Sequence, residues 1–276
     1  MGDQTEAFHA FEQAGWGNAE LADSYDRHMS VLTRQSVQAL LDAARVDHRS
    51  RVLDVATGAG YVAGAAAGRG AAATGVDFSP AQVTLARGRY PGVGFQEADA
   101  EALPFEHGSF DAWTCAFGMC HFPHPEAALR EASRVLVPGG RVAFTVWEAP
   151  ARCAGFAIFY GAMRELGSME VDVPAGPDFF WFSDAGRCVS ALTEAGFGDA
   201  RVTTVPQFWH LPDADALFRI MADATVRAAA VLKAQSPAAR AAIRDAMRER
   251  LGPYARIDGQ VDLPMPAVLA SAVKPA

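Results

Sequence analysis

The sequence predicts an α/β fold built on a mostly parallel, doubly wound β-sheet, with helices inserted before the last strand. Three observations lead to this prediction. From Arg51 onward, short apolar runs alternate with helical stretches, a spacing typical of right-handed βαβ units. A glycine-rich turn joins the first of these runs to the next helix. Two apolar-rich helical stretches then separate the last two predicted strands.

Capping and hydrophobic spacing predict helices in the N-terminal region. Asn18 is a side chain that caps helices well, and we expect a helix from there to about His28. A second helix follows, because Val31, Leu32, Val37, Leu40 and Leu41 recur near helical spacing. Residues 1–17 mix polar and apolar side chains, and we predict no individual helix or strand there.

The central region predicts five strands and the helices between them. The strands are Val52–Ala56, Ala72–Val76, Val93–Gln96, Ala112–Phe117 and Val142–Trp147. The helices are Tyr61–Gly68, Pro80–Arg89 and Pro125–Leu136, and the turn Pro138-Gly139-Gly140 leads into the fifth strand.

The remaining chain predicts a helix at Ser183–Ala195, a strand at Arg201–Phe208, helical stretches at about 213–234 and 237–251, and a last strand at Val268–Val273. We therefore expect four segments: an N-terminal helical lid (1–50), an α/β core (51–210), a helical cap insertion (211–260) and the last core strand with the C-terminus (261–276).

Composition excludes several classes of function. The net charge is −8 and no basic stripe is present, which argues against a nucleic-acid partner. There is no signal-peptide pattern and no apolar run of membrane-spanning length, so we expect a cytoplasmic protein without a membrane partner. The four cysteines lack the spacing of a disulfide framework. A monomer and a homodimer both remain open, because 213–251 could form a lid or a dimer interface.

The strongest motif runs from Asp54 to Gly60, where a buried strand ends in a carboxylate and glycines open a helix. Glycines there allow a tight turn and a close approach of the backbone to a ligand. Gly58, Gly60 and Ala63 also satisfy a dinucleotide-binding pattern, so this motif alone does not choose between cofactors.

Two further strand ends carry ligand-like residues. Asp77 follows the second strand, where a carboxylate can accept both ribose hydroxyl protons, although it could instead cap the next helix. Phe78 offers a flat face to a purine ring, or belongs to the core. Asp99 follows the third strand. Since the carboxyl ends of parallel strands form the ligand crevice, we expect these residues to surround one ligand.

With these residues the sequence resembles the class I S-adenosylmethionine-dependent methyltransferases, and especially the ubiquinone and menaquinone biosynthesis branch that includes many natural-product enzymes. The resemblance covers about residues 20–150 and implies S-adenosyl-L-methionine as cofactor, a small-molecule acceptor and a role in secondary metabolism. It also implies a Rossmann-like sheet of seven strands whose last strand, Pro266–Lys274, is antiparallel. Ala56 replaces the family's first glycine.

The resemblance implies a role for each matching residue. Asp54, Ala56, Gly58 and Gly60 would surround the methionine part, Asp77 the ribose and Phe78 the adenine, while Asp99 and the Ala100 backbone would read the adenine edge. Phe117 would offer its carbonyl to the cofactor's amino group, and Tyr25 would close over the cofactor.

His121 is the candidate catalytic residue. It follows the fourth strand, where an acceptor should lie, and a histidine there could take a proton from a phenol, an enol or an activated carbon. It could equally be a loop histidine or a helix cap, and His28 is a second candidate. A metal site formed by Cys115, Cys120, His121 and His124 is disfavoured because these residues make no closed ligand set, and we predict no metal.

The acceptor is expected to be hydrophobic or aromatic, because aromatic residues cluster late in the chain. They are Phe156, Phe159, Tyr160, Phe179, Phe180, Trp181, Phe182, Phe208 and Trp209, with His210. They could instead be ordinary core. Two other functions stay open: an NAD(P)-dependent oxidoreductase, against which the absence of a Tyr-x-x-x-Lys motif argues, and a cyclase or other protein that binds the cofactor without transferring a methyl group.

Overall fold

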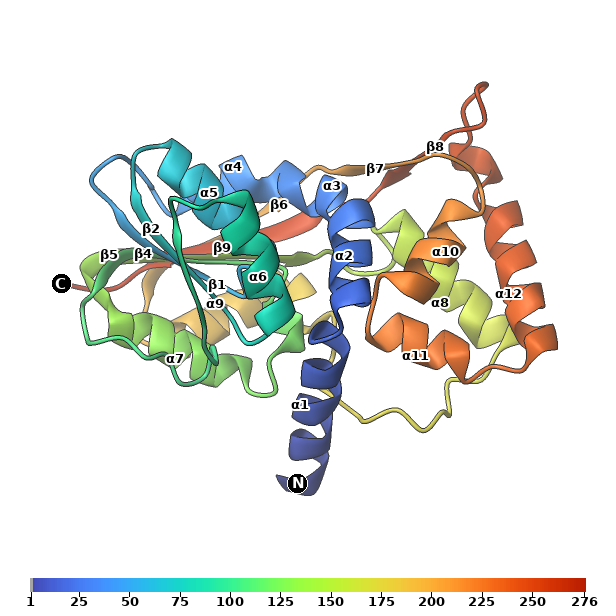
Figure 1. Ribbon diagram of the computed structural model, residues 1–276, viewed down its shortest axis with the longest axis horizontal. Helices are drawn as coiled ribbons and strands as arrows, with labels where there is room; N and C mark the ends of the chain where they lie inside the picture. Colours follow the sequence, from blue (N-terminus) through green and yellow to red (C-terminus); the bar gives the residue numbers. More distant parts are fainter. Residues whose placement is uncertain (1) are drawn as a thin grey trace.

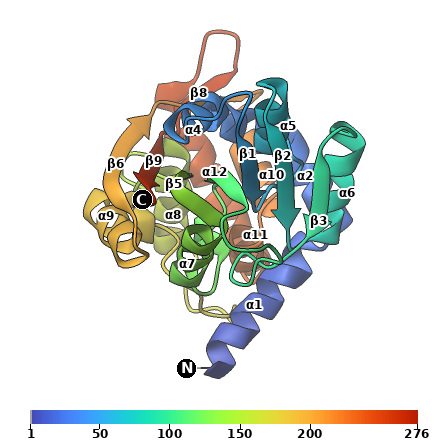
Figure 2. The ribbon, with the colours of Figure 1, turned by 90° about the vertical axis from the view of Figure 1, so that its left-hand side faces the viewer.

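The computed structural model describes residues 2–276 and contains a seven-stranded sheet in the order β3-β2-β1-β4-β5-β9-β6. Its strands are β1 (Arg51–Val55), β2 (Ala72–Asp77), β3 (Gly94–Glu97), β4 (Phe110–Ala116), β5 (Leu136–Trp147), β6 (Gly198–Val205) and β9 (Ala267–Val273). Figure 2 shows the sheet from β3 at one edge to β6 at the other.

Helices cover both faces of this sheet, as a doubly wound fold requires. In Figure 1, α4 (Val37–Ala43), α5 (Tyr61–Gly68) and α6 (Pro80–Arg89) lie on one side of the strands, and α7 (Pro125–Val135) and α9 (Ala185–Glu194) lie on the other. Strands β1 to β5 pair in parallel. The predicted α/β fold is therefore confirmed.

Strand β9 runs antiparallel to both of its neighbours, β5 and β6, with Val142 opposite Ala272 and Val202 opposite Ala270. This confirms the antiparallel last strand that the family resemblance implied. The chain thus inserts a strand from its C-terminal region between two strands formed much earlier in the sequence.

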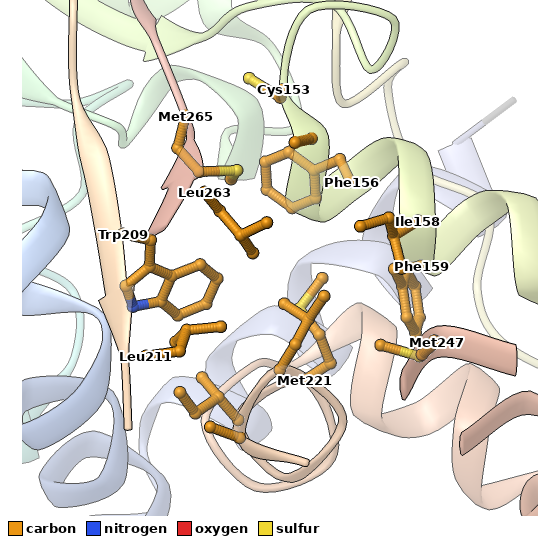
Figure 3. Packing of buried hydrophobic residues seen from close by; sticks show 14 of the residues in the cluster. Cys153, Phe156, Ile158, Phe159, Trp209, Leu211, Met221, Met247, Leu263 and Met265 are labelled. Carbon is orange, nitrogen blue, oxygen red and sulfur yellow. The ribbon is translucent and has the colours of Figure 1, made fainter. Parts of the chain in front are cut away.

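A helical region lies beyond the carboxyl ends of the strands, at the right of Figure 1. It contains α8 (Ala154–Leu166), α10 (Ala216–Asp223), α11 (Arg227–Lys233) and α12 (Pro237–Arg250). The predicted helix at 213–234 is thus two helices, broken near Ala224. Helix α8 belongs to this region too, because it packs against α12. Figure 3 shows the shared core, where Phe159 lies beside Met247, and Met221 and Leu263 belong to the same cluster.

The predicted strand at Arg201–Phe208 is wrong at its end. Strand β6 stops at Val205, Pro206 follows, and Phe208–Leu211 forms a separate strand, β7, that pairs antiparallel with β8 (Val261–Pro264) in a second sheet. Proline lacks the N–H that a continuing ladder needs, which accounts for the break. Strands β7 and β8 precede and follow most of the helical region along the chain, since the residues between them contain α10, α11 and α12.

The N-terminal region forms four α-helices and a 3-10 turn. Helix α1 (Gly2–Trp16) has no counterpart among the sequence predictions, whereas α2 (Ala19–His28) begins where Asn18 predicts, with the Asn18 side chain accepting from the amides of Glu20 and Leu21. The second predicted helix is split into α3 (Ser30–Thr33), a 3-10 turn and α4. In Figure 1, α2 stands between the sheet and the helical region, and α1 extends below it.

Candidate active site

The carboxylate at the end of β1 is buried and held by hydroxyl groups. Thr57 Oγ1 donates to Asp54 at 2.6 Å, and Thr114 Oγ1 on neighbouring β4 donates to it at 3.0 Å. Burial raises the pKa of Asp54 to about 7, against the lowering effect of these hydrogen bonds. A cationic group beside Asp54 would restore its charge, so this position suits an ammonium ligand.

The turn from β1 to α5 uses positive φ angles, which bring its backbone close to the strand ends. Ala56, Gly58 and Gly60 have φ of 53°, 53° and 84°. A Cβ on Gly60 would lie 2.9 Å from the Phe95 ring, so this glycine is needed for packing. A Cβ on Gly58 would meet only Gln82 Oε1, at 3.8 Å, and would otherwise enter open space. That space can therefore admit a ligand.

Asp77 ends β2 and is oriented by two backbone amides. The Gly58 N–H donates to it at 2.9 Å and the Ser79 N–H at 3.0 Å. Burial raises the pKa of Asp77 to about 6, so it is mainly ionised at neutral pH. The cap of α6 is Ser79, whose hydroxyl accepts from the Gln82 amide, so capping does not explain Asp77.

Three cavities adjoin at the carboxyl ends of the strands, and Tyr25 lines all three. The strand-end cavity has a volume of about 450 Å³ and is lined by Asp77, Phe78 and Gly58 among others. The α2 cavity, about 500 Å³, reaches Asp54 on one side and Asp26 and Arg34 on the other. The aromatic cavity, about 540 Å³, lies between the strand ends and the helical region.

Most of the predicted cofactor residues meet at these cavities. Those lining at least one are Tyr25, Asp54, Ala56, Gly58, Asp77, Phe78 and Phe117, together with His121. Among the described residues, Gly60, Asp99 and Ala100 lie outside all three linings, and their contact with a cofactor stays a prediction. Asp99 accepts from the Glu101 amide at 2.8 Å, and Ala100 is buried in the core.

Phe117 ends β4 with φ of 58°, which turns the chain away from the sheet. Its amide donates to Thr145 O at 2.8 Å, and its carbonyl accepts from the Cys120 thiol at 3.4 Å. Its ring packs on Trp147 with centroids 4.2 Å apart. Phe117 lines both the strand-end and the aromatic cavity, at the boundary between them.

A buried charged cluster that no sequence motif marked links α1 to two distant segments. Glu12 is only 2% exposed, and its two carboxylate oxygens accept from three side chains. His121 Nδ1 lies 2.8 Å from Oε2, Trp16 Nε1 donates to the same oxygen at 2.9 Å, and Arg227 Nε donates to Oε1 at 2.8 Å. The cluster joins α1, the segment after β4 and the start of α11.

The pKa values of this cluster favour ionised groups. For Glu12, burial raises the pKa, but His121 and Arg227 lower it more, to about 2. For His121, burial lowers the pKa, while the neighbouring Cys120 and Glu12 raise it to about 10. The raised pKa of His121 favours its imidazolium form, in which Nδ1 donates to Glu12.

The aromatic residues named from the sequence divide into two groups. Phe156, Tyr160 and Phe179 line the aromatic cavity, and Phe180 packs against all three rings. The others do not line it. Trp209 is buried with its Nε1 donating to His28 O, and Trp181 is 47% exposed under the Arg187 guanidinium. Phe182 packs on Phe144 at the sheet.

The cysteines and histidines after β4 form no evident metal centre. Within residues 2–276, no three His, Cys, Asp or Glu side chains gather as a metal-binding group, and all four cysteines are buried and unpaired. No helix in that range is both long and apolar enough to cross a bilayer.

These features define an α/β protein with buried carboxylates, a glycine turn and a cavity at the carboxyl ends of its strands, and a second, apolar cavity beside them. Residues 53–144 match the family model described as a methyltransferase domain. The chain is 38% identical over 156 residues to a demethylmenaquinone methyltransferase from Thermus thermophilus, covering 51% of this chain and 69% of that one. It is 39% identical over 137 residues to a ubiquinone/menaquinone biosynthesis C-methyltransferase from Bartonella tribocorum, covering 44% of this chain and about half, 52%, of the relative.

The chain belongs to the class I S-adenosylmethionine-dependent methyltransferases, and S-adenosylmethionine is its cofactor. This family membership displaces the nicotinamide-dependent alternative. Solved structures agree on the fold. A Haemonchus contortus phosphoethanolamine N-methyltransferase, in complex with S-adenosylhomocysteine, has a TM-score of 0.53 at 19% identity over 87% of this chain and 52% of its own. The cyclase SpnF has a TM-score of 0.51 at 21% identity over 88% of this chain and 82% of its own.

Proposed function

We propose that this protein transfers a methyl group to a small hydrophobic or aromatic acceptor held in the aromatic cavity. One observation carries the proposal: the aromatic cavity adjoins the strand-end cavity, and Trp16, Tyr25, Phe117 and His121 line both. A ligand in one cavity would thus lie next to a ligand in the other. Near-attack positioning of this kind supplies about 7–11 kcal/mol of a barrier.

The chain's own residues fit the cofactor in three places. Asp77, fixed by two backbone amides, would accept the ribose hydroxyl protons, and Phe78 would flank the adenine. The open space above Gly58 would hold the methionine part, with Asp54 near its ammonium group. The α2 cavity adds Arg34, a residue that sequence reasoning did not single out and that suits a carboxylate. When bound, S-adenosylmethionine supplies an electrophilic methyl group on a sulfonium.

His121 is the residue we propose to handle the acceptor's proton. Its Nδ1 is engaged by Glu12, which leaves Nε2 as its other functional nitrogen, and the imidazole lines both cavities. In its neutral form Nε2 can take a proton from an acceptor hydroxyl, and in its charged form it can stabilise the resulting oxyanion.

We also propose that residues 1–50 act as a lid and 211–260 as a cap. The Ser79 hydroxyl donates to Trp16 O at 2.7 Å, and Arg227 donates to Cys120 O at 2.7 Å. These contacts hold both segments against the carboxyl ends of the strands. The role in secondary metabolism and the cytoplasmic location are proposals that rest on the sequence alone.

The first experiment is calorimetric titration of the purified protein with S-adenosylmethionine and, separately, with NADH. We expect micromolar binding of S-adenosylmethionine and none of NADH. Aromatic acceptors are then screened for formation of S-adenosylhomocysteine together with a methylated product. Binding without any S-adenosylhomocysteine across the screen would favour a protein that keeps its cofactor intact, as a cyclase on this fold would.

A further inference from the structure

The charges that line the aromatic cavity are all of one sign. Among the described residues lining it, Arg227 and His121 carry positive charge, and none is an aspartate or a glutamate. The remaining lining is apolar or neutral, with Phe156, Tyr160 and Phe179 supplying the rings. Burial raises the pKa of Tyr160 to about 12, so its phenol stays neutral.

The counter-charge to these cations lies on their far side from the cavity. Glu12 contacts both Arg227 and His121 but does not line the cavity. Within this cluster one carboxylate faces a guanidinium and an imidazolium, and the next carboxylate, Asp77, interacts with His121 from the strand-end cavity. The aromatic cavity itself has no acidic side chain in its lining, so an anion bound there would interact favourably with both partly buried cations.

Both cations retain donor capacity toward the cavity. The Arg227 guanidinium donates to Glu12, to Pro177 O at 3.2 Å and to Cys120 O at 2.7 Å, which uses three of its five N–H groups. His121 uses Nδ1 for Glu12, which leaves the Nε2 N–H of the imidazolium, with the Cys120 thiol as a neighbouring side chain. Two rigid donors on one wall can bind an anionic oxygen.

We propose that the acceptor is bound as an anion: an apolar ring in the aromatic cavity bearing an ionised oxygen that Arg227 and His121 hold. This inference rests on the proposed function and narrows its acceptor class to acids. The acceptor's O–H proton goes to Nε2 where His121 enters neutral, or to solvent where it enters as imidazolium. In both cases the complex contains an oxyanion beside an imidazolium, and Glu12 is the positioning residue for both cations.

The test is an optical titration with 4-nitrophenol, whose phenolate and phenol absorb differently, and with its neutral methyl ether, 4-nitroanisole. Protein with and without S-adenosylhomocysteine is added about one pH unit below the probe's own pKa. We expect the phenolate band to grow on binding, with an affinity at least about tenfold above that for 4-nitroanisole, which is one pKa unit of discrimination. Benzoate as a competitor separates a carboxylate acceptor from a phenol.

Variants test whether Arg227 and His121 are the residues that stabilise the bound phenolate. Arg227→Gln and His121→Gln should each reduce growth of the phenolate band about tenfold, whereas Arg219→Gln should leave it unchanged, because Arg219 pairs with Asp213 on the protein surface away from the cavity. Circular dichroism verifies that each variant is folded. The wild-type comparison of the two probes stands even where a variant does not fold.

Equal binding of the two probes, or bound 4-nitrophenol that stays protonated, would overturn the inference while leaving the methyltransferase proposal intact. Failure of both probes to bind a protein that binds S-adenosylhomocysteine would also overturn it. Loss of S-adenosylhomocysteine binding alone would instead count against the cofactor-site assignment, and the probe titration without cofactor would still decide the charge of the acceptor.

Discussion

Replacing Glu12 by glutamine should destabilise the protein far more than an ordinary surface change. The substitution keeps the size of the side chain but removes its charge and turns one acceptor into a donor, facing His121, Trp16 and Arg227, which are all donors. The pKa of Glu12 falls from 4.5 to about 2, and at about 1.4 kcal/mol per unit this corresponds to about 3 kcal/mol of folding free energy. Breaking a buried ion pair typically costs about 3–5 kcal/mol.

The matched control is Glu165→Gln. Glu165 also pairs with an arginine, Arg250, but its side chain is 63% exposed, and such pairs contribute about 0–1 kcal/mol. In thermal unfolding followed by circular dichroism, Glu12→Gln should lower Tm by about 6–12 °C, at about 2–4 °C per kcal/mol for a chain of this size. Glu165→Gln should lower it by less than about 4 °C.

The effect should also depend on pH in a defined window. The lowered pKa of Glu12 stabilises the fold above pH 4.5, and this contribution is lost as the pH falls toward about 2. The raised pKa of His121 stabilises the fold below pH 6.5, and that contribution is lost as the pH rises toward about 10. Both contributions include the attraction between Glu12 and His121, so the difference between wild type and Glu12→Gln should be largest between pH 4.5 and 6.5. At pH 10 it should shrink to the part that Arg227 supplies.

The result that would refute this reasoning is a Tm loss for Glu12→Gln no larger than that for Glu165→Gln, with Trp16 fluorescence unchanged. Unchanged fluorescence would show that α1 stays docked without the charge. If Trp16 alone became exposed while Tm stayed constant, the cluster would hold α1 locally and would not contribute to global stability, which also contradicts the stated magnitude.

Other predictions concern the cofactor, the sheet and the aromatic cavity. Asp77→Ala should weaken S-adenosylmethionine binding by about 1–3 kcal/mol in calorimetry, and wild-type affinity should fall below about pH 6, where Asp77 becomes protonated. Gly75→Ala should cost about 1–3 kcal/mol in denaturant unfolding, because its Cβ would lie 2.5 Å from a phenylalanine ring, while Gly94→Ala, with open space around it, should be neutral or slightly stabilising. Phe179→Ala should weaken 4-nitrophenol binding about tenfold, and Trp181→Ala, on an exposed side chain, should not change it. Equal changes in stability for the two glycine variants would contradict the packing argument at Gly75. Equal changes in 4-nitrophenol binding for Phe179→Ala and Trp181→Ala would contradict the assignment of Phe179 to the cavity.

The parts of this fold that sequence predicts well are those in which local chemistry decides the structure. Asn18 marks the start of α2, and the glycines after Asp54 mark the turn into α5, because capping and positive φ are properties of single residues. The alternation of strands and helices likewise follows from local periodicity. These signals were enough to place Asp54 and Asp77 at one edge of the sheet.

The remainder depends on contacts between distant segments. Helix α1 escaped prediction because only Phe8, Glu12 and Trp16, at i, i+4 and i+8, mark its inner face, and a glutamate there resembles a solvent-exposed residue. Its burial is explained by its distant partners, His121 and Arg227, which lie 109 and 215 residues further on. In the same way, sequence grouped Trp181 with Phe179, although the chain turns so that one ring is exposed and the other lines a cavity.

The position of β9 between β5 and β6 has a consequence for how the chain folds. During synthesis β5 and β6 emerge well before β9, and until it arrives each presents an unpaired edge of backbone N–H and C=O groups. Such edges pair readily with other chains. Closing the long loop between β6 and β9 should also make insertion of the last strand a late and slow step. We therefore expect aggregation of nascent chains, more than loss of native stability, to limit the yield of this protein when it is made quickly.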